Sequence, residues 1–301
     1  MISERQNSPD MLTLLRAFTW HYRRAKRWHG VRIAGALGFA AAAPIVTFWL
    51  PSAADVVAAI AGAWVLLGRT LIAVAEGREL KMAVTIQEQF DTDLFGLDWN
   101  GALAGVKIAP EDVTEAARHI HDDSMLRNWY ASTAGVPRPL DILLCQRASA
   151  VWGRRTHSDY ALTLAALGCA WFLAGLVMAV FAQLSLAGYL IKLFLPSQPA
   201  YLDAVDLFRS HWRQSDHKRL IERQADIIWD RACSESGADS VSLSDCRAIQ
   251  NESYRLRRHG PQVAQWFFRL RRDRDEQAMR DGVSALVARF NRERGGADSS
   301  S

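Results

Sequence analysis

The sequence has few of the residues that build disulfide frameworks or metal sites. Its 301 residues include four cysteines, and no two of them are spaced as CxxC. Cys145, Cys233 and Cys246 lie in polar regions, and Cys169 lies in an apolar run. We therefore expect no disulfide and no metal site.

Motifs for catalysis are also missing. The chain has no P-loop, no GxSxG, no HExxH and no dinucleotide-binding fingerprint. His119 and His121 form a compact group with Asp122 and Asp123, but positions i and i+2 cannot share one face of a helix. We interpret this group as a solvated helix end, and we expect neither an enzyme nor a bound cofactor.

No stretch alternates apolar and polar residues as a half-buried strand does, so the sequence predicts an all-α protein. Long apolar runs decide its class. Three runs cover residues 31–50, 56–75 and 161–182, and a weaker fourth covers residues 185–207. A run of about 20 residues crosses a bilayer core of roughly 30 Å as a helix. Helices buried in a soluble bundle are the alternative, but the first three runs lack the polar stripe of such helices.

The flanking charges predict how these runs are oriented. Basic residues precede the first run, occupy the loop between the second and third runs, and follow the fourth, whereas the two short hairpin turns contain none. The positive-inside rule then places both termini and the central loop in the cytoplasm. We attribute the net charge of +4 mainly to the basic residues that set the membrane topology, and not to nucleic-acid binding.

These patterns predict an integral membrane protein with four transmembrane helices in two hairpins and cytoplasmic helical regions. The predicted parts are a basic N-terminal segment (1–30), a first transmembrane hairpin (31–75), a cytoplasmic loop (76–160), a second transmembrane hairpin (161–208), a helical C-terminal region (209–293) and a disordered tail (294–301).

Two charges fall within the predicted spans, Arg69 and Lys192. A charge at a helix centre costs about 3 kcal/mol on insertion, whereas each Leu, Ile, Val or Phe contributes about −0.3 to −0.6 kcal/mol. The second run has nine such residues, which offset Arg69. Two interpretations of Arg69 remain. Either its side chain is a tolerated charge that extends to the membrane–water interface, or it lines a pore or pairs with an acidic residue. The same two readings hold for Lys192.

The segment "IQEQFDTDLFGLDWN" (86–100) combines aromatic and acidic residues just after the second run. We call this segment the coupling segment, because its acids could pair with arginines of the C-terminal region and join the spans to the soluble part. A static packing segment is the equal alternative. Its key residues are Phe90, Asp91, Asp93, Phe95, Trp99 and Asn100.

The stretch "SYRLRRHGPQVAQWFFRLRRDR" (253–274) is basic and aromatic. Arginine forks and aromatic faces suit a nucleotide or a lipid headgroup. A helical hairpin with a packed aromatic face and a solvated basic face is the plainer interpretation. The candidate ligand-binding residues are Arg255, Arg257, Arg258, Trp266, Arg269, Arg271 and Arg272.

Three stretches together resemble a known family: residues 86–100, "RNWY…P…LLCQRASAVW" (127–152) and "CRAIQNESYRLRRHGPQVAQWFF" (246–268). The chain is similar to the SMODS-associating four-transmembrane effectors (S-4TM) of CBASS, a group of bacterial anti-phage systems. The sequence has Asp98, Ala131 and Ala150 where the family pattern has Pro, Pro and Asn.

This resemblance implies a membrane effector in the bacterial inner membrane that a cyclic oligonucleotide gates and that causes abortive infection by pore formation or rupture. It implies a cyclic-oligonucleotide synthase (CD-NTase) as functional partner and a homo-oligomer in the lipid bilayer. A transporter or constitutive channel, and a membrane-tethered scaffold or sensor, are the alternatives. The resemblance identifies no ligand-binding residue.

Overall fold

The structure is a computed structural model that describes residues 1–234 and 241–298. Within these ranges the chain forms helices and no strand, which confirms the predicted all-α fold. The elements are α1 (Ile2–Arg5), α2 (Pro9–Trp49), η1 (Pro51–Ala53), α3 (Ala54–Leu67), η2 (Gly68–Ile72), α4 (Ala73–Phe95), α5 (Gly101–Ala104), α6 (Pro110–Ala117), α7 (Leu140–Phe181), α8 (Leu186–Tyr189), η3 (Leu190–Phe194), α9 (Leu195–Ser234), α10 (Leu243–His259) and α11 (Gln265–Asp298).

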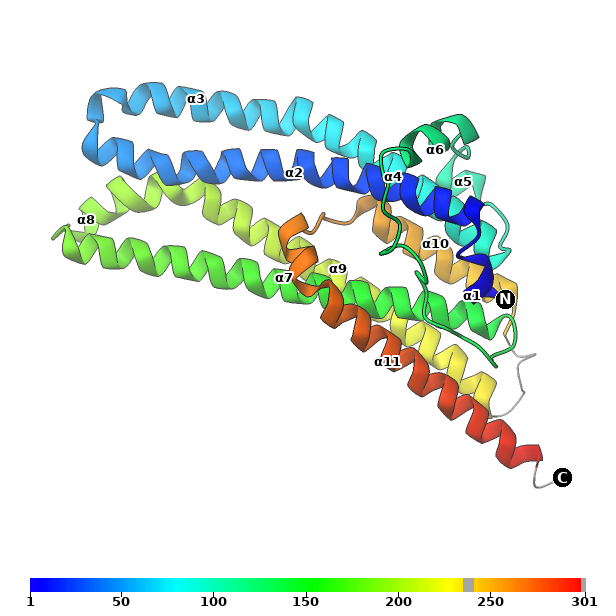
Figure 1. The fold of residues 1–301 in the computed structure, drawn as a ribbon. Helices are drawn as coiled ribbons and strands as arrows, with labels where there is room; N and C mark the ends of the chain where they lie inside the picture. Colours follow the sequence, from blue (N-terminus) through cyan, green and yellow to red (C-terminus); the bar gives the residue numbers. More distant parts are fainter. Residues whose placement is uncertain (235–240, 299–301) are drawn as a thin grey trace.

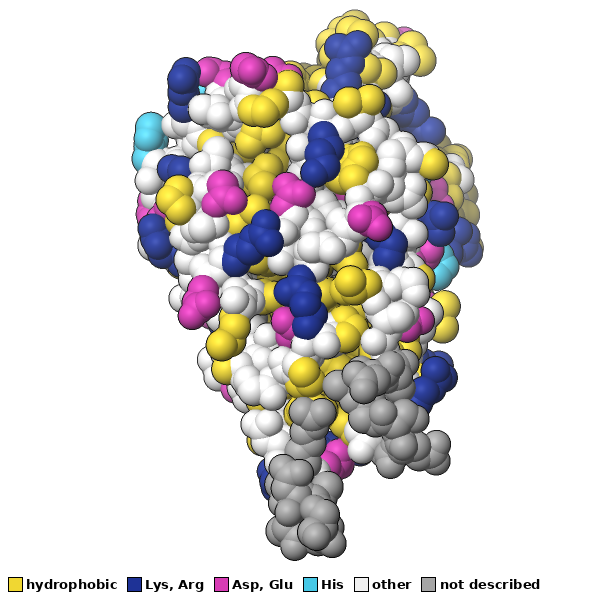
Figure 2. Space-filling view, turned by 90° about the vertical axis from the view of Figure 1, so that its right-hand side faces the viewer, with side chains coloured by type: hydrophobic (Ala, Val, Ile, Leu, Met, Phe, Trp, Pro, Cys, Tyr) yellow, Lys and Arg dark blue, Asp and Glu magenta, His cyan; other side chains and the backbone are white. Residues whose placement is uncertain are grey.

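Two long helical hairpins form the body of the protein (Figure 1). In the first hairpin, α2 packs against the continuous rod of α3, η2 and α4, and in the second α7 packs against α9. The turns of both hairpins lie at one end of the molecule, and both chain termini lie at the other end with α1, α5, α6 and α10. The end with the termini carries basic and acidic side chains interspersed over its surface (Figure 2).

Two of the described helices are long and apolar enough to cross a membrane. The first runs from Asp55 to Phe95 and consists of α3, η2 and α4 as one continuous helix. The second is α7, Leu140–Phe181. Only 11% and 6% of the most apolar stretch of each is buried in the protein. A core helix of a soluble protein would be mostly buried, so the two helices instead expose apolar side chains. The first predicted span, in α2, and the fourth, which covers α8, η3 and the start of α9, remain predictions.

Several helices run through the predicted boundaries without a break. Helix α2 begins at Pro9, a favoured first helical residue, and continues past residue 30 into the first apolar run. In the second hairpin, the π-helical turn η3 comes just before Pro196, and α9 then continues to Ser234. A π turn is a common adjustment where a proline removes a backbone hydrogen bond.

Local sequence features mark several helix ends in the half of the molecule that holds the termini. Helix α4 ends where Gly96 adopts a left-handed φ of 62°, a conformation that glycine tolerates. Ser242 and Asp245 form a capping box at the start of α10. The predicted disordered tail starts too early, because α11 remains helical to Asp298, and residues 299–301 lie outside the described chain.

The main hydrophobic core lies in the half of the molecule that holds the termini. Helices α2, α4, α7, α9 and α10 all contribute to it. Its largest fully buried side chains include Phe18, Phe90, Phe95, Trp229 and Ile249. The core fixes the relative positions of the two hairpins at this end and frames the cavity described next.

Candidate ligand cavity and buried polar network

A cavity of about 940 Å³ lies between the two hairpins, beside the main core. Residues from α2, α4, α7, α9, α10 and α11 line it, together with the segment 119–130 that follows α6. Small-molecule sites in proteins have volumes of roughly 300–1,000 Å³. A ligand in this cavity would therefore touch both hairpins and both C-terminal helices at once.

Basic side chains outnumber acidic ones around this cavity. The basic residues are Arg23, Lys26, Arg127, Lys218, Arg257, Arg269 and Arg272, and the acidic residues are Asp122, Asp273 and Glu276. An excess of cations in a cleft favours an anionic ligand, because low-dielectric walls strengthen the attraction.

Aromatic side chains also line the cavity, and they are packed against one another at its walls. They are Phe18, Tyr22, Trp129, Tyr130, Trp152 and Phe268. The ring of Phe18 meets Trp129 edge to face at 5.4 Å, and Trp152 meets Phe268 in the same way at 5.5 Å. Cations interleaved with aromatic faces are what nucleotide ligands use, with phosphates on the cations and bases on the rings.

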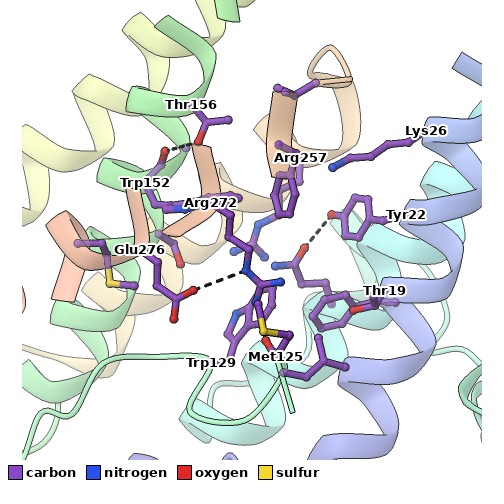
Figure 3. A pocket seen from close by; sticks show the side chains of 18 of the residues that line it. Thr19, Tyr22, Lys26, Met125, Trp129, Trp152, Thr156, Arg257, Arg272 and Glu276 are labelled. Atoms are coloured by element: carbon purple, nitrogen blue, oxygen red, sulfur yellow. Dashed lines mark hydrogen bonds and ion pairs between the residues drawn. The ribbon is translucent and has the colours of Figure 1, made fainter. Parts of the chain in front are cut away.

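Figure 3 shows how these side chains are arranged. Lys26 extends from α2 toward α10, and Arg257 lies between α2 and α7, near the middle of the view. On the opposite side, Arg272 lies near Trp129 and Glu276. The Arg272 guanidinium donates to the Met125 carbonyl at 2.6 Å and lies 3.6 Å from the Glu276 carboxylate.

The structure brings three of the predicted ligand-binding residues to the cavity, namely Arg257, Arg269 and Arg272. The other four do not line it. Arg255 is exposed and pairs with Glu252 at 3.2 Å. Arg271 pairs with Asp159 of α7, and the Trp266 side chain is 54% exposed and meets Tyr160 at 6.5 Å. Arg258 lies elsewhere on α10.

Sequence reasoning missed other residues that line the cavity. Lys26, Trp129 and Lys218 come from three regions far apart in the chain. Lys26 and Lys218 belong to the basic flanks of apolar runs, where the positive-inside rule already accounts for a lysine. Only the packing of α2 against α7 and α9 shows that they face a common space.

The coupling segment contributes a buried polar network next to the cavity. Asp91 on α4 is fully buried, and the Arg257 guanidinium of α10 lies 2.5 Å from its carboxylate. The Tyr130 hydroxyl donates to the same carboxylate at 2.6 Å, and the Gln250 amide donates at 3.0 Å. Burial, followed by the charge of Asp91, raises the pKa of Tyr130 well above its usual value, so the phenol stays protonated and donates.

A second acid extends this network. Glu88, one turn before Asp91, accepts from Arg247 at 2.5 Å and from Gln250 at 2.8 Å. Burial, and then the nearby charge of Asp91, raises the pKa of Glu88. Gln146 of α7 joins the network by donating to the Gln250 side chain at 3.1 Å. The network thus ties α4 to both α10 and α7.

The predicted contacts of the coupling segment are confirmed in part. Asp91 pairs with an arginine of the C-terminal region as expected. Asp93 does not, because it lies on the outer side of α4 and pairs with Lys107 of the central loop at 3.0 Å. Asp98 contacts Arg247 through its backbone carbonyl at 3.0 Å rather than through its side chain.

The remaining residues of the coupling segment hold its end in place. Phe90 and Phe95 are fully buried in the core. Trp99 donates from Nε1 to the Gly105 carbonyl at 2.9 Å, and Asn100 donates to Asn251 of α10 at 3.2 Å. The segment therefore contacts α10 at its end as well as along α4.

Of the two charges in the predicted spans, Arg69 has an acidic partner. Its guanidinium lies 3.8 Å from the Asp203 carboxylate of α9, and both side chains are largely exposed. This pair joins the first hairpin to the second. The side chain of Lys192 lies outside the described part of the chain.

The fold and the cavity define an all-helical protein with apolar helices exposed at one end and a basic, aromatic cavity at the other. The chain belongs to the SMODS-associating 4TM effector domain family, whose model matches residues 1–286. It is 23% identical over 290 residues to a protein of Bacillus cereus strain VD146 that is described as a probable CBASS effector molecule. The aligned residues cover 92% of this chain and 95% of that protein. No solved structure matches the chain significantly.

Proposed function

We propose that this protein is a CBASS effector that a cyclic oligonucleotide switches on and that then permeabilises the bacterial inner membrane. The observation that carries the proposal is the cavity, because it is basic, aromatic and built from helices of both hairpins. Family membership and the similarity to a probable CBASS effector support the link to cyclic-oligonucleotide signalling.

The proposed topology has four spans, with both termini and the central loop in the cytoplasm. Several features support it. The hairpin turns lie together at one end and the termini at the other. Apolar side chains are exposed along the hairpins, including Leu66 (70%), Leu71 (69%), Val180 (78%) and Phe181 (85%). Basic residues flank the helices on the side of the termini, as the positive-inside rule expects for a cytoplasmic side.

The proposed switch follows from the position of the cavity. A ligand shifts a conformational equilibrium only if it contacts the two states differently. A ligand that touches α2, α7, α9 and α10 together favours the arrangement in which these helices surround it best. Each of α2, α7 and α9 continues toward a predicted span, so a change in their packing reaches the membrane part directly.

The permeabilising state is proposed to be a homo-oligomer. Four helices packed as two hairpins leave little room for a water-filled path within one chain, and the exposed apolar faces of α3 and α7 can contact either lipid or other copies. The proposal includes no enzymatic activity and no binding of nucleic acid.

Co-expression in bacteria tests this function. Cells that produce the chain alone, and cells that also produce a synthase of one cyclic di- or trinucleotide, are compared for growth and for uptake of a dye that intact membranes exclude. Growth arrest and dye uptake with one synthase, and only when that synthase is active, are expected. Dye uptake without any synthase would indicate a constitutive channel, and intact membranes with every synthase would favour a tethered scaffold.

A further inference from the structure

The end of the cavity nearest the predicted spans holds basic side chains from three helices. Lys26 comes from α2, His157 from α7 and Lys218 from α9. Lys26 and His157 lie five and four residues before the apolar runs that begin at residues 31 and 161, and Lys218 lies eleven residues after the run that ends at residue 207. We call this end the membrane-side end of the cavity.

The two lysines have no acidic partner. Within the described residues, neither Lys26 nor Lys218 lies within ion-pair distance of a carboxylate, whereas the neighbouring Arg257 is paired with Asp91. Burial lowers the pKa of Lys26 to about 8. Burial, and then the positive charge of Arg257, lowers the pKa of Lys218 to about 7. Buried charges in proteins are normally paired, so two unpaired ammonium groups that face one cavity call for an anion.

The histidine beside them supplies a further donor. The Nδ1 atoms of His157 and His211 lie 2.8 Å apart, and burial first of all lowers the pKa of both rings, that of His211 to about 3. Both rings are therefore neutral, and one Nδ1 donates to the other. Nε2 of His211 is buried without a partner. A buried unpaired acceptor is better tolerated than a buried unpaired donor, so we place the shared proton on Nδ1 of His211. The other proton then lies on Nε2 of His157, and His157 is one of the residues that line the cavity.

A glycine allows one lysine to reach this position. A Cβ atom at Gly153 of α7 would lie 2.7 Å from Cδ and Cε of Lys218 and 2.8 Å from its Nζ. Such distances are shorter than van der Waals contact, so the Lys218 side chain lies across the α7 backbone only because residue 153 has no side chain. Gly153 itself lines the cavity.

We propose that Lys26, Lys218 and His157 form a phosphate-binding subsite at the membrane-side end of the cavity. The ligand class is a phosphodiester, and the inference rests on the proposed function in taking its source to be a cyclic oligonucleotide. Ammonium groups bind phosphate as point charges, and a neutral imidazole N–H donates one hydrogen bond. Nζ of Lys26 also lies over the Phe268 ring, 3.9 Å from its centre, so a cation–π contact holds this ammonium group at the cavity wall.

This subsite would act on the membrane part as well as hold the ligand. Without an anion, the positive charge of Arg257 repels Lys218, and nothing offsets the charges that Lys26 and Lys218 bring to His157. A bound phosphate replaces that repulsion by attraction and draws α2, α7 and α9 together at the level where they approach the spans.

The test measures the binding of two probes to the full chain in phosphatidylcholine nanodiscs. Inorganic pyrophosphate tests the subsite alone, and a panel of cyclic di- and trinucleotides tests the subsite within the proposed function. Lys26→Met with Lys218→Met removes both charges. Gly153→Ala keeps both charges but displaces the Lys218 side chain. Lys81→Met, at an exposed position of α4, is the matched control.

We expect pyrophosphate and one nucleotide to bind the wild type and the Lys81→Met variant with equal affinity. Loss of both charge-assisted contacts should weaken binding on the order of 10- to 100-fold or more, and Gly153→Ala should weaken it by a smaller factor. Removing two unpaired buried charges should not lower the melting temperature, so loss of folding does not explain loss of binding.

The outcomes separate the subsite from the function. A nucleotide that binds the double lysine variant as tightly as the wild type overturns the subsite and leaves the proposed function standing. Pyrophosphate binding that depends on the lysines, with no nucleotide bound, supports the subsite and overturns the proposed ligand. Repeating the assay with phosphatidylglycerol in the nanodiscs tests a lipid source. Competition by this lipid in the wild type, in the absence of nucleotide binding, would assign the phosphate to a headgroup.

Discussion

Replacing Asp91 by Asn should destabilise the protein severely, because Asp91 is the buried acid on which the network beside the cavity depends. Its carboxylate is fully buried and lies 2.5 Å from the Arg257 guanidinium. Breaking a buried ion pair by removing one partner costs about 3–5 kcal/mol, because the remaining charge is left buried without compensation. The neutral amide also replaces an acceptor of Tyr130 and Gln250 by a group that is partly a donor.

The same helix offers a matched control two residues away. Asp93 pairs with Lys107 at 3.0 Å, but both side chains are substantially exposed, at 38% and 45%. Exposed pairs contribute about 0–1 kcal/mol, so Asp93→Asn should be nearly neutral. The substitution is chemically identical at the two positions, and the expected difference comes from burial alone.

Thermal unfolding of the purified variants, followed by tryptophan fluorescence, measures this difference. With about 2–4 °C per kcal/mol for domains of 150–250 residues, the melting temperature should fall by roughly 6–20 °C for Asp91→Asn and by less than about 4 °C for Asp93→Asn. Adding Arg257→Met to Asp91→Asn removes the orphaned charge and should recover part of the loss. Equal shifts for the two single variants, or a double variant no more stable than Asp91→Asn, would refute the reasoning.

Three further predictions follow from other parts of the structure. Gly96→Ala should lower stability by about 1 kcal/mol, since φ at this helix end is 62°, and a denaturant titration checks it. Trp229→Ala should cost about 3–5 kcal/mol because the side chain is 1% exposed, whereas Trp229→Phe should cost much less because its indole nitrogen has no partner, and thermal unfolding separates the two. The pKa of Lys218, lowered to about 7 by burial and then by the charge of Arg257, predicts that pyrophosphate affinity falls as pH rises from 6 to 8. The protonated form is the one that binds an anion, so the fall should approach tenfold per pH unit at the upper end, and Lys218→Met should flatten this dependence.

The all-α fold and the limits of several helices could be predicted because they depend on local chemistry. Gly96 ends α4 because glycine tolerates a left-handed backbone conformation. Ser242 and Asp245, three residues apart, begin α10 through hydrogen bonds to each other's backbone N–H groups. The pairing of Asp91 with a C-terminal arginine could also be anticipated. An acid in an aromatic segment that must be buried needs a cation, and the basic stretch 253–274 supplies several.

The cavity itself could not be predicted, because it is a property of how the helices pack. The arginines of residues 253–274 looked equivalent in sequence, yet the break near Gly260 divides them between α10 and α11. As a result, Arg257 faces the core while Arg255 faces solvent. The sequence alone suggests the same role for Asp93 as for Asp91, but two residues along a helix correspond to a turn of about 200°, which places the two side chains on opposite sides.

The measurement that tests the central claim most directly is dye release from liposomes that contain the purified protein, against a panel of cyclic di- and trinucleotides. The account predicts release with one nucleotide, no release without it, and little release at the same concentration from the Lys26→Met, Lys218→Met variant. Release without any nucleotide, or no release from wild-type protein whose insertion is confirmed, would contradict it.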